Sequence, residues 1–168
     1  YIRFINKEPI VKSDQMIDFD DYLAKAVEMI NLEGDSQLIV DILEKSLDMI
    51  DLNSNNTSLW FTYKKLCKIK IEFADNIDGE KDCNKAVMIN PNDTSSYLYL
   101  GIKRSKLNDH YGAISAYNKV LKIDSENIFA YYDRGISKGR LGDHTGEISD
   151  YNKVIEINPK YTYAYYNR

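Results

Sequence analysis

The sequence predicts an all-α solenoid in which antiparallel helix pairs stack side by side. Three observations predict it: the 168 residues contain an internal repeat of 34 residues, each repeat divides into two halves of helical periodicity, and Gly or Pro stands where a half ends. Hydrophobic residues make up 43% of the chain and charged residues 29%, which suits a packed core beneath a hydrophilic surface.

The repeat is clearest in the second half of the chain. Residues 94–127 match residues 128–161 without a gap at 14 of 34 positions. The identities include an aromatic, a glycine and a four-residue run: Tyr97/Tyr131, Gly101/Gly135, and 117–120 on 151–154. Residues 162–168 match the start of the preceding repeat again, so we expect a truncated repeat there.

Each repeat has the pattern of two helices. In the last full repeat, four apolar residues share one helical stripe: Ile148, Tyr151, Val154 and Ile155. Gly142 suits the end of the first helix, and Pro159 closes the second. We expect helices at 14–32, 36–52, 57–73, 77–89, 94–107, 110–123, 128–141 and 144–157. Residues 1–13 are expected to be an extended lead-in, and 14–168 the solenoid.

The earlier repeats follow the same plan more loosely. Residues 60–93 align through Leu66-Cys67, which fall under Leu100-Gly101, and residues 20–53 align through a Glu-Gly-Asp turn at 33–35. An excess of about six residues near 53–58 is interpreted as a longer loop. Alternatively, Trp60 takes the aromatic position of Tyr97 and the extra residues divide between two loops.

These residues resemble the tetratricopeptide repeat family, whose 34-residue unit carries an aromatic, Leu-Gly, Ala, further aromatics and Pro. The matching positions are Tyr97, Leu100, Gly101, Ala113 and Tyr117 in one repeat, and Tyr131, Gly135, Tyr151 and Pro159 in the next. The resemblance implies a right-handed superhelix whose concave face is lined by the first helix of each pair. It also implies a role in binding peptides or partner proteins.

Several positions depart from the family pattern. Arg104 and Lys138 stand where a second aromatic is usual. Where one repeat has an apolar trio, the next has a charged trio: Leu100, Ala113 and Ala116 against Arg134, Glu147 and Asp150. We expect Arg134 to pair with Glu147, Asp150 or both, because a partly buried guanidinium needs its donors satisfied.

The cysteines and histidines give no sign of catalysis. Cys67 stands at the position of the small Gly where the two helices of a pair cross, and Cys83 stands at the position of the aromatic residue of the second helix. We therefore expect buried structural thiols, with a disulfide as the alternative. His110 and His144 occupy equivalent places in adjacent repeats, at least ~8–10 Å apart, too far to share a metal ion. Because no phosphate-binding loop, nucleophile elbow or HExxH pattern appears, we expect no enzyme activity, no catalytic residue, no metal and no cofactor.

Charge narrows the classes of partner. The net charge is −4, which disfavours nucleic acid, and no apolar run is long enough for a membrane helix. Residues 13–56 carry eleven acids against two bases, either as a solvated surface or as a region that repels or attracts a partner. Because the chain starts at Tyr1 rather than Met, we expect a piece of a longer protein. The sequence shows no signal peptide, which weakly favours a cytoplasmic location without assigning a compartment.

The first helices present stripes that form a candidate groove, basic at its N-terminal end and aromatic at its C-terminal end. Its residues are Phe61, Lys64, Lys68, Ile71, Leu98, Ile102, Phe129, Tyr132, Ile136, Tyr163 and Tyr166. We therefore predict a scaffold or adaptor whose groove binds a peptide or protein with an acidic portion and two or three apolar anchors. The family's Lys/Asn carboxylate clamp is absent, so that ligand is not carried over.

Two alternative functions stay open at the level of sequence. The chain is a regulatory or substrate-recruiting segment of a larger enzyme, or it is a structural array that self-associates through its truncated C-terminal repeat. In the second case, Tyr163 and Tyr166 only continue the stack into a further repeat.

Overall fold

The computed structural model describes residues 36–49, 56–72 and 79–168, and within these ranges every regular element is an α-helix. The helices are α2 (Ser36–Met49), α3 (Asn56–Glu72), α4 (Glu80–Ile89), α5 (Thr94–Lys106), α6 (His110–Ile123), α7 (Ile128–Arg140), α8 (His144–Ile157) and α9 (Thr162–Asn167). The expected helix at 14–32 and the lead-in at 1–13 lie outside the described residues.

Helix ends fall where the turn residues predicted them. Asp109 and Asp143 accept a hydrogen bond from the backbone N–H three residues later, at 2.9 Å in each case, and so cap α6 and α8. The preceding turns pass through the left-handed region at Asn108 (φ 62°) and Gly142 (φ 82°), a conformation that Asn and Gly adopt readily. The same short turn therefore closes both helix pairs.

Residues 50–55, which hold part of the excess expected to lengthen a loop, lie outside the described residues. The helix expected at 57–73 is observed as α3, so its start lies within one residue of the prediction. This helix has 17 residues, whereas α5 and α7 have 13 each. Part of the insertion therefore extends the first helix of its pair by about one turn.

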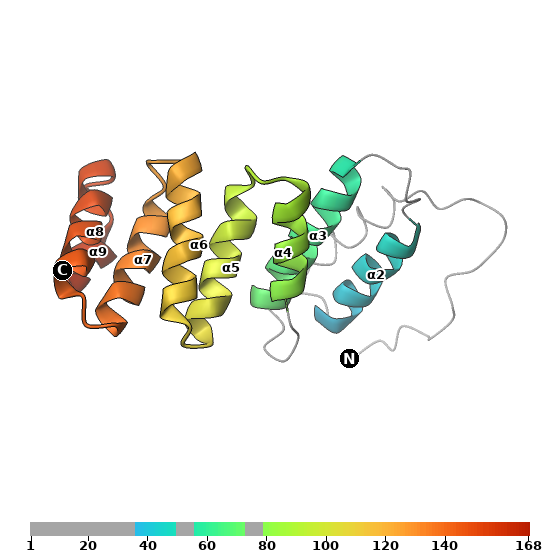
Figure 1. Ribbon diagram of the computed structural model, residues 1–168, viewed down its shortest axis with the longest axis horizontal. Coiled ribbons are helices and arrows are strands. Elements are labelled where there is room, and N and C mark those ends of the chain that lie inside the picture. Colours follow the sequence, from blue (N-terminus) through green and yellow to red (C-terminus); the bar gives the residue numbers. More distant parts are fainter. Residues whose placement is uncertain (1–35, 50–55, 73–78) are drawn as a thin grey trace, which may run out of the picture.

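The helices stack in a row in chain order, with α3–α4, α5–α6 and α7–α8 as neighbouring pairs (Figure 1). Each core cluster joins two successive pairs: Cys67, Ile71 and Cys83 pack with Leu100 and Ala116. The next clusters repeat this arrangement: Ala113, Tyr117 and Val120 with Ala130, then Tyr151 and Val154 with Ala164. Each pair thus buries its apolar surface against its neighbours, as expected of a solenoid.

A glycine and a tyrosine meet where the two helices of a pair cross. A Cβ on Gly135 would lie 2.9 Å from Cε1 of Tyr151, and a Cβ on Gly101 would collide with the ring of Tyr117. Both tyrosines are 1% exposed. Only glycine lets each helix approach so large a buried ring.

The pair α3–α4 closes the same crossing with a disulfide. Cys67 and Cys83, at the positions of the glycine and the tyrosine, are bonded, and their Cα atoms are 4.8 Å apart. The expectation of two free structural thiols is wrong, and the alternative holds. Two small side chains leave the space of the missing ring unfilled, so the helices approach closely enough for the sulfurs to bond.

The charged trio forms an ionic crossing, as predicted for Asp150. Arg134 makes two hydrogen bonds to the carboxylate of Asp150, of 2.9 and 2.6 Å, and Lys138 adds an ion pair at 2.9 Å. Asp150 is only 2% exposed, so both cations offset its desolvation. Glu147 bonds elsewhere, to His144 and Tyr151.

The two cations in place of the second aromatic have a shared role. Arg104 and Lys138 each reach a backbone carbonyl in the first turn of the following helix, that of Gly112 and Gly146 respectively, at 3.5 Å. Arg104 also pairs with Glu80 of the preceding helix pair at 3.0 Å. A cation that satisfies a carbonyl thus replaces an aromatic that would only pack.

Candidate functional site: the inner face of the solenoid

The first helices of successive pairs contact one another, α3 with α5 and α5 with α7, and their shared surface is the inner face. Its floor consists of four predicted groove residues that are partly buried against the core clusters: Leu98, Ile102, Tyr132 and Ile136. These side chains are both structural support and accessible apolar surface. A ligand on the inner face would meet a floor that is already fixed by packing.

The N-terminal end of the predicted groove is less basic than its sequence indicates. Lys64 pairs with Asp93 at 2.9 Å and lies 4.9 Å from the ring centre of Trp60, and Lys68 lies 3.8 Å from Glu72. The lysine charges are therefore largely balanced within the protein.

Two further predicted residues at this end differ in accessibility. Ile71 is 3% exposed and belongs to the core cluster around the disulfide, so it is not part of the accessible surface. Phe61 stays partly exposed, with the ammonium of Lys65 5.2 Å from its ring centre. Burial, and then the nearby charges of Lys68 and Lys64, lower the pKa of Lys65.

The C-terminal end of the inner face is strongly aromatic. Phe129 is 53% exposed, Tyr163 66% and Tyr166 90%. A pocket of about 590 Å³ is lined by two of them, Tyr163 and Tyr166, together with Tyr132, Thr162 and Asn167. The rings of Tyr132 and Tyr161 are 5.4 Å apart in an edge-to-face arrangement. The structure therefore brings three of the predicted aromatics together, Tyr132 of α7 with Tyr163 and Tyr166 of α9.

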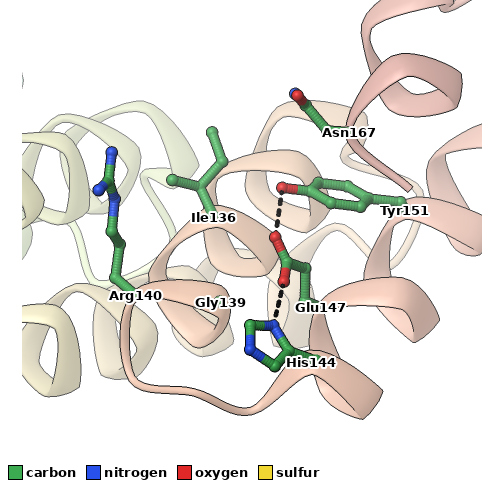
Figure 2. A pocket seen from close by; sticks show the side chains of 7 residues that line it. All are labelled: Ile136, Gly139, Arg140, His144, Glu147, Tyr151 and Asn167. Atoms are coloured by element: carbon green, nitrogen blue, oxygen red, sulfur yellow. Dashed lines mark hydrogen bonds and ion pairs between the residues drawn. The ribbon is translucent and has the colours of Figure 1, made fainter.

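A second, more polar pocket of about 360 Å³ lies between α7, α8 and α9 (Figure 2). Glu147 occupies its wall and is held from both sides, by Nδ1 of His144 at 3.0 Å and by the hydroxyl of Tyr151 at 3.3 Å. Gly139 gives it room, since a Cβ there would lie 2.5 Å from the Glu147 carboxyl group. The sequence signal for this pocket was the Glu that replaces the usual small Ala.

Asp133, which neighbours Tyr132 on α7, is a further residue of interest that no sequence pattern indicated. Burial raises the pKa of Asp133 from 3.8 to about 6. No periodicity identifies such a residue, because its environment depends on which side chains the neighbouring helices bring to it.

Neither a metal-binding cluster nor a membrane-crossing helix is found in the described part of the chain. No group of three His, Cys, Asp or Glu side chains within it could hold a metal ion. None of its helices combines the length and apolarity that a membrane crossing requires.

The fold and the inner face define an α-solenoid of stacked helix pairs. Residues 130–161 match the family model described as tetratricopeptide repeat. Together with the solved structures below, this match confirms the resemblance to tetratricopeptide repeat proteins. No curated protein sequence matches the chain significantly.

Several solved structures have the same fold. A crystal structure of MamA superimposes with a TM-score of 0.78 at 21% identity, covering 90% of this chain and 79% of that one. A tetratricopeptide repeat protein from Parabacteroides merdae gives 0.78 at 17% identity, covering 89% and 57%. YrrB, described as a TPR protein with an unusual peptide-binding site, gives 0.70 at 19% identity, covering 88% and 73%. At these identities the likeness establishes the fold alone.

Proposed function

We propose that this protein is a non-catalytic scaffold or adaptor whose inner face binds a peptide or a segment of a partner protein. The observation that carries the proposal is the exposed aromatic surface of Tyr163 and Tyr166 at the pocket of about 590 Å³, with Phe129 also exposed on α7. Clustered, exposed aromatic side chains of this kind are typical of contact surfaces.

The chemistry of the face indicates how such a segment would bind. Apolar side chains would enter the aromatic C-terminal end, where rings are already ordered by contacts with Tyr132 and Tyr161. The floor residues Leu98 and Ile102 would continue the apolar track towards α3. The peptide-binding site described for YrrB, which shares this fold, supports the same mode of use.

The test compares inner-face and outer-face variants against the same partner. After partners are isolated on the immobilised protein, their affinity is measured for Tyr132→Ala and for Lys122→Ala, an exposed control on α6. We expect the first variant to lose ~2 kcal/mol of binding free energy and the second almost none. Because Tyr132 also packs against the core, the double variant Phe129→Ala/Tyr166→Ala provides an independent check on exposed residues.

Equal affinities for all variants, each with native helical content by circular dichroism, would mean that the inner face is not the binding surface. Self-association is the second candidate, because Tyr163 and Tyr166 of α9 are so exposed. Light scattering over a concentration series distinguishes it: a dimer that Tyr166→Ala dissociates would favour self-association over an adaptor.

A further inference from the structure

The carboxylate of Asp133, on α7, is the exception among the buried and partly buried aspartates near the helix crossings that the structure describes. Among the residues that the structure describes, it has no hydrogen-bond or ion-pair partner; only the backbone carbonyl of Asp133 accepts a bond, from Ser137. The other buried carboxylates each meet a cation: Asp82 meets Lys70, Asp93 meets Lys64, and Asp150 meets Arg134 and Lys138.

Equivalent positions in the neighbouring repeats show what is missing at Asp133. A shift of 34 residues places Tyr99 and Asn167 there. The side-chain amide of Asn167 donates to the hydroxyl of Tyr132 at 2.7 Å. Burial, and then the nearby carboxylate of Glu72, raise the pKa of Tyr99. In both cases a polar group on one first helix lies near a polar group on the first helix before it.

The residues at the corresponding positions next to Asp133 form no hydrogen bond or ion pair with its carboxylate. The position of Tyr132 is taken by Leu98, which has no polar atom in its side chain. The position of Glu72 is taken by Lys106, whose ammonium instead donates to the backbone carbonyl of Ile71 at 3.1 Å. The carboxylate therefore has no partner among the described residues, and Asp133 stays partly accessible.

The surroundings of Asp133 favour a cation. Four tyrosines have a raised pKa, first because they are themselves buried and in addition because the negative charge of Asp133 is near: Tyr117, Tyr132, Tyr151 and Tyr161. Tyrosine rings attract cations through their faces, and a desolvated carboxylate without a partner gains more from one than an exposed carboxylate does. A metal ion fits poorly, because no group of three metal-binding side chains exists in the described part of the chain.

We propose that Asp133 is the anchoring point for a lysine or arginine side chain of the protein segment that binds the inner face. The cationic group would pair with the carboxylate, while its aliphatic stem lies against Tyr132 and Leu98. This inference rests on the proposed function and deepens it, since it assigns a basic residue to the ligand between its apolar anchors. The sequence predicted that lysines of the inner face bind an acidic portion of the ligand, but those lysines are already paired within the protein. The inference instead places a basic residue of the ligand at Asp133.

A random dodecapeptide display library, selected on the immobilised protein and on Asp133→Asn at pH 7.5, tests the inference. We expect peptides selected on the wild type to share a lysine or arginine next to apolar residues. Peptides selected on Asp133→Asn should keep the apolar residues and lose the basic one. If both selections give the same sequence pattern, cation recognition by Asp133 is wrong while binding to the inner face survives. If no peptide is enriched on either protein, the proposed function fails together with this inference.

A matched peptide pair then measures the contribution of the charge. The best arginine peptide is compared with its citrulline analogue, which has nearly the same shape but no charge. We expect the citrulline peptide to bind the wild type at least tenfold more weakly than the arginine peptide does. The affinities of the two peptides for Asp133→Asn should differ by less than twofold. Glu156→Gln, an exposed carboxylate on α8, is the control and should discriminate like the wild type. Discrimination that persists unchanged in Asp133→Asn would overturn the assignment.

Discussion

The helix pairs α5–α6 and α7–α8 have nearly the same backbone but different chemistry at their crossing. Both have an aspartate cap, a left-handed turn residue and a glycine beneath a buried tyrosine. The first pair fills the adjacent space with Leu100, Ala113 and Ala116, and the second fills it with Arg134, Glu147 and Asp150. The backbone of the repeat thus tolerates charge in its core when every charge meets a partner.

The pair α3–α4 combines both strategies and adds a covalent one. Lys70 pairs with Asp82 at 2.9 Å, the equivalent of the Lys138–Asp150 contact, and the disulfide replaces the glycine–tyrosine contact. The three crossings therefore depend on packing, on ion pairs and on a covalent bond in different proportions. Substitutions that remove one of these interactions should therefore destabilise the three helix pairs to different extents.

The largest effect is expected from removing the disulfide. Cys67→Ala/Cys83→Ala, or reduction of the wild type, should lower the free energy of unfolding by ~3 kcal/mol, because the bond closes a loop of 16 residues. Hydrogen exchange should accelerate in α3 and α4 more than in α7 and α8. Reductant should leave the double variant unchanged. Equal urea midpoints for oxidised and reduced protein would contradict the prediction.

The ionic crossing should show strong coupling. Arg134→Leu should cost roughly 1–3 kcal/mol of stability, because Asp150 then keeps only Lys138 as a partner. The triple variant Arg134→Leu/Glu147→Ala/Asp150→Ala, which copies the neighbouring repeat, should be far milder. Urea denaturation measures both, and if the single and triple variants unfold alike, the ion pairs do not stabilise the crossing as described.

Asp133 should give a smaller effect that depends on pH. The pKa of Asp133 is about 6 in the folded protein, compared with 3.8 for an aspartate in the unfolded chain. The folded state therefore loses stability as the pH rises through this interval. Asp133→Asn should therefore be more stable than the wild type by roughly 1–2 kcal/mol at pH 7.5 and nearly equal to it at pH 3.5. Urea titrations at both values test this. A variant less stable at pH 7.5 would show that the carboxylate has a partner in solution.

The smallest effect is expected at the N-terminal end of the inner face. Because Lys68 is solvent-exposed and already near Glu72, Lys68→Ala should change the affinity for a bound peptide by less than ~0.5 kcal/mol. Its effect should appear mainly as a weaker dependence of the association rate on salt. A loss as large as that of Tyr132→Ala would mean that this end, rather than the aromatic end, dominates binding.

Much of the fold could be predicted because its signals are local. The spacing of Gly, Pro and aromatic residues locates the helices from residue 57 onwards to within a few residues. The pairing of Arg134 with Asp150 was also predictable, since aligned repeats exchange an apolar trio for a charged one. The groove was harder to predict, because a helical stripe does not distinguish a floor residue such as Ile136 from a core residue such as Ile71.

By itself, the sequence determined the helix pairs, their order and the residues that face inwards, because these follow from periodicity and turn chemistry along the chain. The tertiary structure decided which inward residues stay accessible. Ile71 is buried by the neighbouring pair, and Lys64 is paired with Asp93 from the start of α5. The packing of α7 against its neighbours leaves Asp133 partly buried and without a partner among the described residues. Burial and charge balance depend on residues far apart in the sequence, which no local pattern records.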